Sequence, residues 1–515
     1  MTLNPGDIAP PDIAYAAISP MLVVAGAAVV SVLLEAFLPR GTRRLPQLAL
    51  TLAALVTALV LLLTVGDVDV VTAGGAIAVD GVSRFTQALL LVIGILGALL
   101  LADRMPGGED SFAPQASAVP GSAAEDAARR AGLQQTEIYP LYLFVMLGML
   151  VFPAANDLLT LFVALEVFSL PLYLLCGMAR RRRLLSQEAS LKYFLLGSFS
   201  SAFFLYGAAL LYGYAGSISL PDINDAVLAG TGPDVLLVLG LGLLVIGLLF
   251  KVSAVPFHSW TPDVYQGAPT PVTAFMAAAT KVAAFAALLR VLYVAVPADR
   301  WDWQPVLWVV AIITMVLGSA VAVVQRDVKR MLAYSSIAHG GFILTGVLAV
   351  SVAGLSGTLF YLAAYALTTI GAFAAVSLVR DSAGEASSLT SWTGVGRRSP
   401  IFAGVFALFL LALAGIPLTS GFTGKFAVFS AAVEGGAEFL AVVGVLASAV
   451  AVFFYARIIA LMFFSEPTEG TGTVAVPGIG MAGVLAVAAV GTIVLGVAPS
   501  FVLSLTQDVS LFLAR

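Results

Sequence analysis

The sequence has few charged residues, and lysine is the least frequent of the four charged types. Asp, Glu, Lys and Arg together make up 10% of its 515 residues, whereas hydrophobic residues make up 60%. A soluble domain has roughly 25% charged residues, so an ordinary soluble protein is excluded. We predict an all-α protein that is embedded in the lipid bilayer and crosses it many times.

Cysteine and histidine are also scarce. Cys176 is the only cysteine in the sequence, which excludes an internal disulfide or a cysteine-ligated metal cluster, and two histidines are too few for a usual zinc or haem site. The sequence contains no phosphate-binding loop and no nicotinamide or flavin fingerprint. The net charge of −4 gives no indication of a nucleic-acid partner. We therefore expect this chain to bind no metal and no cofactor, and to lack a complete active site of its own.

Apolar runs long enough to cross a bilayer, about 20 residues each, account for most of the chain. They predict fourteen transmembrane helices. The runs lie at 17–37, 47–65, 84–102, 138–153, 158–178, 188–214, 235–257, 271–296, 304–324, 331–351, 354–379, 400–433, 437–464 and 476–504.

The distribution of basic residues predicts the orientation. With an external N-terminus, sixteen of the 25 basic residues fall in cytoplasmic loops and three fall outside. Cytoplasmic loops of membrane proteins carry such an excess of Lys and Arg. We expect both termini on the periplasmic or external side. Residues 105–137, rich in Pro, Gly, Ala and Ser, are predicted to form a flexible cytoplasmic loop.

Two of the predicted spans are interrupted by proline and small polar residues, near Pro256 and near Pro417, 161 residues apart. An ordinary proline kink is one interpretation. Two breaks at matching positions instead favour two inverted five-helix repeats, each with one broken helix, because unwound backbone is tolerated in a membrane where protein or water satisfies it. The predicted organisation is spans one to three in 1–104, the loop, a first repeat in 138–297, a second repeat in 298–465, and the last span in 466–515.

Four of the five lysines fall within predicted spans, and a carboxylate accompanies them. Glu166 is in span five, Lys251 precedes the first break, Lys281 is near the middle of span eight, and Lys425 follows the second break. An ionisable group within a membrane is costly and indicates a partner or a hydrated pathway. We interpret these residues as a proton pathway, since desolvation and a nearby carboxylate change the proton affinity of lysine in opposite directions.

Further candidates have competing structural interpretations. Lys192 either joins the pathway or forms a helical ion pair with Glu188 at the membrane edge. His258, beside the first break, and His339, in span ten, either relay protons or pack as ordinary buried histidines. Arg457 is expected to be buried in span thirteen, whereas Glu35 and Arg290, near span ends, are interpreted as structural.

Several long segments resemble a known family. They are SQEASLKYFLLGSFSSAFFLYGAALLYG, PFHSWTPDVYQGAPTPVTAFMAAATKVAAF, VKRMLAYSSIAHGGFIL and GIPLTSGFTGKF, at 186–213, 256–285, 328–344 and 415–426. They resemble the antiporter-like membrane subunits of respiratory complex I, the bacterial NADH:quinone oxidoreductase, and most closely its N-type members. The resemblance covers spans four to thirteen, and it is weak before span four and absent from the loop.

The resemblance implies a non-redox, proton-translocating subunit in the membrane arm of that enzyme, located in a bacterial inner membrane. Its partners would be the neighbouring antiporter-like subunit and small membrane subunits. NADH, flavin, iron–sulfur clusters and quinone would be bound by partner subunits. It places Glu166, Lys192, Lys251, His258, Lys281, His339 and Lys425 along one polar axis. Two alternatives remain open: a subunit of a multisubunit cation/proton antiporter, and a scaffold that joins membrane subunits without conducting protons.

Overall fold

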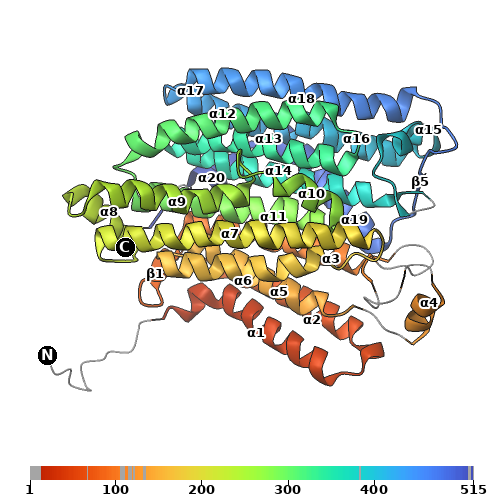
Figure 1. The fold of residues 1–515 in the computed structure, drawn as a ribbon, viewed down its shortest axis with the longest axis horizontal. Helices are drawn as coiled ribbons and strands as arrows, with labels where there is room; N and C mark the ends of the chain where they lie inside the picture. The colour runs from red at the N-terminus through yellow and green to blue at the C-terminus, as the bar shows by residue number, and fades with distance from the viewer. Residues whose placement is uncertain are drawn as a thin grey trace.

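Long helices, packed side by side with roughly parallel axes, form nearly the whole molecule (Figure 1). The structure, a computed structural model, describes residues 13–66, 68–104, 111–113, 119, 122–131, 135–381, 384–508 and 512–513. Within these ranges twelve helices are long and apolar enough to cross a membrane, and two shorter apolar stretches, Ile138–Ala154 and Pro400–Ala414, complete fourteen spans. The predicted all-α, multi-pass fold class is therefore confirmed.

The first eight spans, with their connecting helices, cover the chain up to residue 295. The helices are α1 (Tyr15–Phe37), α2 (Arg44–Thr64), α3 (Gly81–Ala102), α4 (Ala123–Arg130), α5 (Ile138–Val151), α6 (Leu158–Cys176), α7 (Arg183–Ala215), α8 (Leu220–Ala229), α9 (Asp234–Val252), α10 (Trp260–Gly267) and α11 (Thr270–Arg290), with the short helices η1 (Arg40–Thr42), η2 (Phe152–Ala154) and η3 (Val291–Ala295).

The remaining spans follow with similar lengths. They are α12 (Arg300–Val324), α13 (Val328–Leu348), α14 (Val352–Leu378), α16 (Pro400–Ala414), α17 (Ser420–Glu434), α18 (Glu438–Phe464) and α19 (Ile479–Val497), with the shorter η4 (Leu389–Trp392), α15 (Val395–Arg398) and α20 (Ser500–Asp508).

Short strands connect helices at the two ends of the bundle. At one end β1 (Val70–Thr72) pairs antiparallel with β2 (Ile77–Val79), Val71 opposite Ala78. At the other end β3 (Val379–Asp381) pairs antiparallel with β4 (Gly384–Glu385) and with β5 (Thr473–Val474). Figure 1 shows β1 and α8 at the left end and β5, α15 and α4 at the right end. The right end carries the arginine-rich loops that the positive-inside rule predicts to be cytoplasmic.

Both interrupted spans are broken in the structure. The span near Pro256 consists of α9 and α10, and the span near Pro417 consists of α16 and α17. Each first half ends at a residue with left-handed backbone conformation, Ser253 at φ 64° and Gly415 at φ 84°. Proline then prevents the helix from continuing, because it lacks the backbone N–H that an α-helix needs. The breaks therefore leave carbonyl groups inside the bundle without helical partners.

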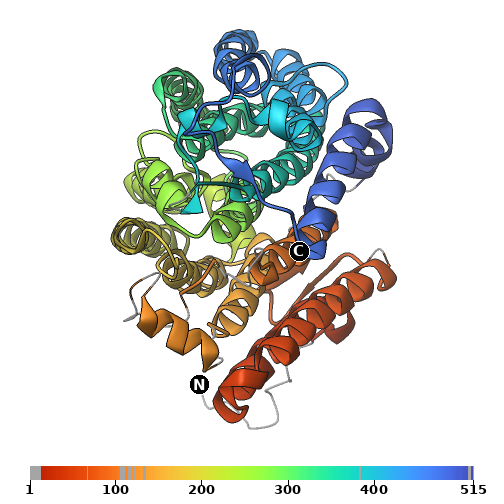
Figure 2. The same cartoon turned by 90° about the vertical axis from the view of Figure 1, so that its right-hand side faces the viewer.

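The lysine-bearing helix α11 lies at the centre of the molecule. The apolar window of α11 is 100% buried, and those of α13 and α14 are each 94% buried, whereas the window of α1 is 39% buried. The view along the helices shows α1 and α2 at one edge (Figure 2). The alanine-rich sequence of α11 allows this burial, because small side chains let neighbouring helices approach closely.

One expectation about arginine needs correction, that for Arg457, whereas the structural interpretation of Arg290 agrees with its ion pair at the end of α11. Arg457 of α18 is exposed rather than buried, and its Nη1 donates to the carbonyl of Val323 at 3.2 Å. It points outward because the buried side of α18 is occupied by residues such as Tyr455 and Ile458. Arg290, expected near a span end, is 0% exposed. Its Nη2 bonds both carboxylate oxygens of Asp80 at 2.8 Å, which makes the pair one of the most deeply buried charged contacts in the described residues.

We predict that Arg290→Met strongly destabilises the protein, by about 3–5 kcal/mol, because it leaves the charge of Asp80 buried without its partner. Asp80 also caps α3 through the backbone N–H of Ser83. The matched control is therefore Asp80→Asn combined with Arg290→Met, since asparagine can cap the helix without a charge. The double variant should melt at a higher temperature than Arg290→Met alone, and a lower melting temperature would contradict the prediction.

Candidate functional site

A row of buried basic side chains crosses the centre of the bundle. Lys251 of α9, Lys281 of α11, His339 of α13 and Lys425 of α17 are between 0% and 5% exposed. Each comes from a different helix, and two of these helices belong to the broken spans. The structure thus places four of the seven predicted site residues in the core of the protein.

Lys281 and Lys425 each bind the carbonyl end of a broken half-helix. Lys281 Nζ donates to the carbonyl oxygen of Val252, the last residue of α9, at 2.5 Å. Lys425 Nζ donates to the carbonyls of Leu413 and Ala414, at the end of α16, at 3.1 and 2.9 Å. An ammonium group at this position satisfies orphan carbonyls and lies at the negative end of the helix dipole.

The two contacts differ in their source. Lys281 reaches the break from the following span, whereas Lys425 lies on the second half of the same broken span. Lys425 also donates to Ser448 Oγ of α18 at 2.7 Å, and its Nζ is 4.9 Å from the centre of the Phe342 ring. Each lysine therefore holds a half-helix in place through hydrogen bonds that depend on the state of its amino group.

His339 lies between these two breaks. Its Nδ1 is 2.8 Å from Tyr361 OH and its Nε2 is 3.5 Å from Tyr455 OH. A Cβ at the next residue, Gly340, would lie 3.0 Å from the carbonyl oxygen of Val252 and 3.4 Å from Lys281 Nζ. This part of α13 is thus in direct contact with the first break. The two tyrosine hydroxyls can donate or accept a proton on either side of the His339 imidazole.

Among the described residues Lys251 bonds a serine of α6 rather than Glu166 itself. Ser169, one turn after Glu166 on α6, accepts a hydrogen bond from Lys251 Nζ at 2.7 Å and itself donates to the carbonyl of Leu165. Glu166 Oε1 is buried and has no hydrogen-bond partner among the described residues. A buried carboxylate oxygen in this state is costly, so it marks a place where a water molecule or a shifted side chain is expected.

Aromatic rings enclose the amino group of Lys251. The centres of the Phe168, Tyr173, Tyr193 and Phe250 rings lie 5.4 to 5.7 Å from Nζ. Cation–π attraction to these rings partly replaces the water that burial removes.

Lys192 and His258 lie outside the central row. The Lys192 side chain is 41% exposed, and its Nζ lies 2.6 Å from Glu188 Oε1 and 2.6 Å from Asp263 Oδ2. The helical pair with Glu188 is therefore present, with a second carboxylate that also binds Arg330 at 2.6 Å. His258 is half-buried in the first break, and its Nδ1 has no partner in the part of the chain that the structure describes.

Several polar residues in this region were not identified from the sequence. Ser169, Ser448, Tyr361 and Tyr455 contact the predicted residues directly, and Asp263 joins Lys192 to Arg330. Ser169 had a signal, because a residue three positions after Glu166 shares its helix face. In the described ranges no group of three or more His, Cys, Asp or Glu is arranged to hold a metal.

The comparisons with known proteins agree with this geometry. Residues 155–451, more than half of the chain, match the family model described as the transmembrane region of NADH:quinone oxidoreductase and Mrp antiporters. The chain therefore belongs to the family of antiporter-like membrane subunits, the class that its two broken spans and buried lysines define. Within this family it is an N-type subunit of NADH-quinone oxidoreductase, on the similarities that follow.

Relatives named NADH-quinone oxidoreductase subunit N match almost the whole chain. The protein from Rhodococcus opacus is 59% identical over 98% of this chain and 97% of its own length. The protein from Mycobacteroides abscessus is 56% identical over 98% of this chain and 99% of its own length.

Solved structures show the same fold. A chain of respiratory complex I from Thermus thermophilus, with bound aureothin, is 35% identical, with a TM-score of 0.76 over 94% of this chain and 98% of that chain. A chain of the Mrp complex from Dietzia, at 23% identity and a TM-score of 0.80 over 97% of both chains, shows the fold alone.

We predict that Ser169→Ala lowers proton transfer between Glu166 and Lys251, because it removes the hydroxyl that Lys251 contacts and changes little else. One lost hydrogen bond to a charged group corresponds to about 1.5–3 kcal/mol, or roughly tenfold or more in rate if this step limits turnover. The measurement is proton translocation per NADH oxidised by the assembled complex in vesicles. Ser201→Ala is the matched control, because it removes a buried hydroxyl that has no hydrogen-bond partner in the described ranges. Equal translocation by Ser169→Ala and Ser201→Ala would contradict the role of Ser169.

Proposed function

We propose that this protein is a proton-translocating subunit in the membrane arm of NADH-quinone oxidoreductase, driven by redox chemistry in other subunits and carrying no redox centre itself. The observation that carries the proposal is the pair of buried lysines, Lys281 and Lys425, bound to the ends of two broken half-helices. This arrangement couples the charge of each lysine to the position of a helix.

The coupling has a direct physical basis. A hydrogen bond from a charged donor stabilises by about 1.5–3 kcal/mol, and one from a neutral donor by about 0.5–1.5 kcal/mol. Loss of the proton from Lys281 therefore weakens its hold on Val252 by roughly 1 kcal/mol. A change in the position of α9 acts in the reverse direction and changes how tightly Lys281 holds its proton.

Each residue has a proposed role along this axis. Glu166 accepts the proton and exchanges it with Lys251 through Ser169. Lys281 is the central carrier, His339 with Tyr361 and Tyr455 connects the two breaks, and Lys425 is the carrier at the second break. Lys192 acts at the membrane edge through its carboxylate partners, and His258 acts at the first break.

The wider assignment follows the family. We infer a location in a bacterial inner membrane with both termini outside, and assembly with a neighbouring antiporter-like subunit and small membrane subunits. NADH, flavin, iron–sulfur clusters and quinone belong to other subunits in this proposal. The high positive charge of the loops at the α15 and β5 end supports a cytoplasmic position for that end.

We predict that Lys281→Ala lowers the number of protons translocated per NADH, with the complex still assembled, because the central carrier and the cap of α9 are both lost. In the part of the chain that the structure describes, the neighbouring Thr280 side chain bonds only the carbonyl of Met276 within α11, so Thr280→Ala is the control and should leave the ratio unchanged. Vesicles with the purified complex and a pH-sensitive dye provide the measurement.

Two other functions give different results in the same vesicles. An unchanged ratio in Lys281→Ala would support a scaffold that conducts no protons and would sink the proposal. The family model also includes Mrp antiporters, so a cation/proton antiporter is the second candidate. Sodium-dependent pH changes without NADH, abolished by Lys281→Ala, would favour that candidate.

A further inference from the structure

A small polar cavity lies at the end of the bundle that we assign to the cytoplasm. It has a volume of about 60 Å³ and lies among the α6–α7 loop, the α10–α11 loop, the start of α13 and strands β3 and β4. A cavity that holds one water molecule is smaller, about 10–15 Å³, so this one has room for a small ion such as a tetrahedral oxyanion.

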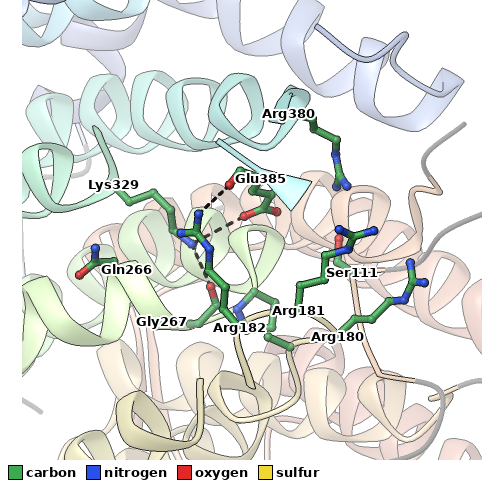
Figure 3. A pocket seen from close by; sticks show the side chains of 12 residues that line it. Ser111, Arg180, Arg181, Arg182, Gln266, Gly267, Lys329, Arg380 and Glu385 are labelled. Atoms are coloured by element: carbon green, nitrogen blue, oxygen red, sulfur yellow. Dashed lines mark hydrogen bonds and ion pairs between the residues drawn. The ribbon is translucent and has the colours of Figure 1, made fainter. Parts of the chain in front are cut away.

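Cationic side chains dominate the lining, and Figure 3 shows the guanidinium groups of Arg181 and Arg380 on the same side of the cavity, opposite Lys329. Arg180, also in the lining, is neutralised by a two-point contact with Glu125 at 2.7 and 3.1 Å. Among the described residues Glu385 is the one carboxylate of the lining. Apart from Arg180 and Arg181, three cations, Arg182, Lys329 and Arg380, therefore face a single acid.

Lys329 has a donor left for a ligand. Its side chain is 4% exposed, and its Nζ donates to the carbonyl of Ala268 and to Thr270 Oγ1, each at 3.0 Å. Glu385 Oε2 lies 3.9 Å from Nζ, too far for a hydrogen bond. An ammonium group has three N–H donors, so one has no partner at bonding distance in the described part of the chain.

Arg380 has an unused donor as well. Its Nε is buried and lacks a hydrogen-bond partner among the described residues. Buried N–H groups of arginine are normally satisfied, and each exception suggests an unrecorded partner. A ligand with several acceptor oxygens would satisfy Arg380 and Lys329 together.

Two features of the backbone lie beside the cavity. Arg182 has a left-handed conformation, φ 54°, which is uncommon for a residue with a side chain. This conformation accompanies hydrogen bonds from its guanidinium group to Ser387 Oγ at 3.1 Å and to the carbonyl of Glu385 at 3.0 Å. The 21-residue helix α11 also begins beside this cavity, and the positive end of its helix dipole favours an anion.

From this geometry we propose that the cavity binds one phosphate-type oxyanion, held by Lys329, Arg380 and Arg182 at the N-terminus of α11. Free phosphate and the phosphate group of an anionic phospholipid share this chemistry. The ligand would join the α10–α11 connection to β3 and β4, and so fix the base of the first broken span. The proposal is independent of proton transfer, because it concerns binding alone.

The test uses the purified, delipidated NADH-quinone oxidoreductase complex that contains this chain. Binding of radiolabelled inorganic phosphate is compared between the native complex and a variant carrying Arg182→Gln with Arg380→Gln. Loss of two charge-assisted contacts should weaken binding at this site by about tenfold or more. Arg457→Gln, at an exposed arginine of α18, is the control and should bind as the native complex does. A thermal melt checks that the variant complex is intact, and Arg380→Gln alone, with a severalfold loss expected, replaces the double variant if it does not assemble.

A second measurement distinguishes the two possible sources of the anion. Displacement of the labelled phosphate by phosphatidylglycerol in nanodiscs, with no displacement by phosphatidylcholine, identifies a lipid headgroup. Displacement by free phosphate and by neither lipid identifies the soluble ion. Equal phosphate binding by the native complex and the arginine variants would overturn the proposal.

Discussion

Everything at the centre of this protein depends on satisfying carbonyl groups inside a membrane. A helix that stops in mid-membrane exposes up to four carbonyls that lipid cannot bond. Here Lys281 bonds the last carbonyl of α9, that of Val252, and Lys425 bonds the carbonyls of Leu413 and Ala414 at the end of α16. The dependence is mutual, because an ammonium group buried in the same place would itself be too costly without acceptors. Neither the breaks nor the lysines are stable without the other.

The surrounding helices make this interaction strong. The α11, α13 and α14 helices are almost wholly enclosed, so charges in the central row are screened by little water. In such surroundings a change of one charge affects its neighbours over longer distances than it would at a surface. Helices α1, α2, α12, α18 and α19 contribute by excluding lipid and water, and their outer faces carry large apolar residues such as Phe439 and Val487.

The spans, the two breaks and the central basic residues are predictable from the sequence. The polar partners of these residues are not, for identifiable reasons. Apolar length predicts the spans, and proline with glycine predicts where two of them break. Lys251, Lys281, Lys425 and His339 are recognisable because a charged or titratable side chain in an apolar run is costly and needs polar partners. The partners of these residues are not recognisable, because Tyr361, Tyr455 and Ser448 are ordinary residues of apolar helices and acquire their role through contacts 22 to 116 positions away. The predicted burial of Arg457 was wrong for a related reason, because the overall hydrophobicity of a span does not show which side of α18 faces inward.

The position of Lys329 in the structure could not be predicted from the sequence. In the sequence it stands beside Arg326 and Arg330 in a stretch that satisfies the positive-inside rule, so it reads as one more loop cation. In the structure its side chain is 4% exposed and bonds the carbonyl of Ala268, just beyond the end of α10. The first broken span thus has a lysine at the end of each half, Lys281 at the break and Lys329 at the membrane edge. Because α10 is only eight residues long, its position depends on tertiary contacts more than on its own hydrogen bonds. These contacts include the stacking of Trp260 on Tyr193 as well as the bond of Lys329 at its end. Lys329 therefore joins the membrane edge to the same broken span whose first half is bonded by Lys281 at its end.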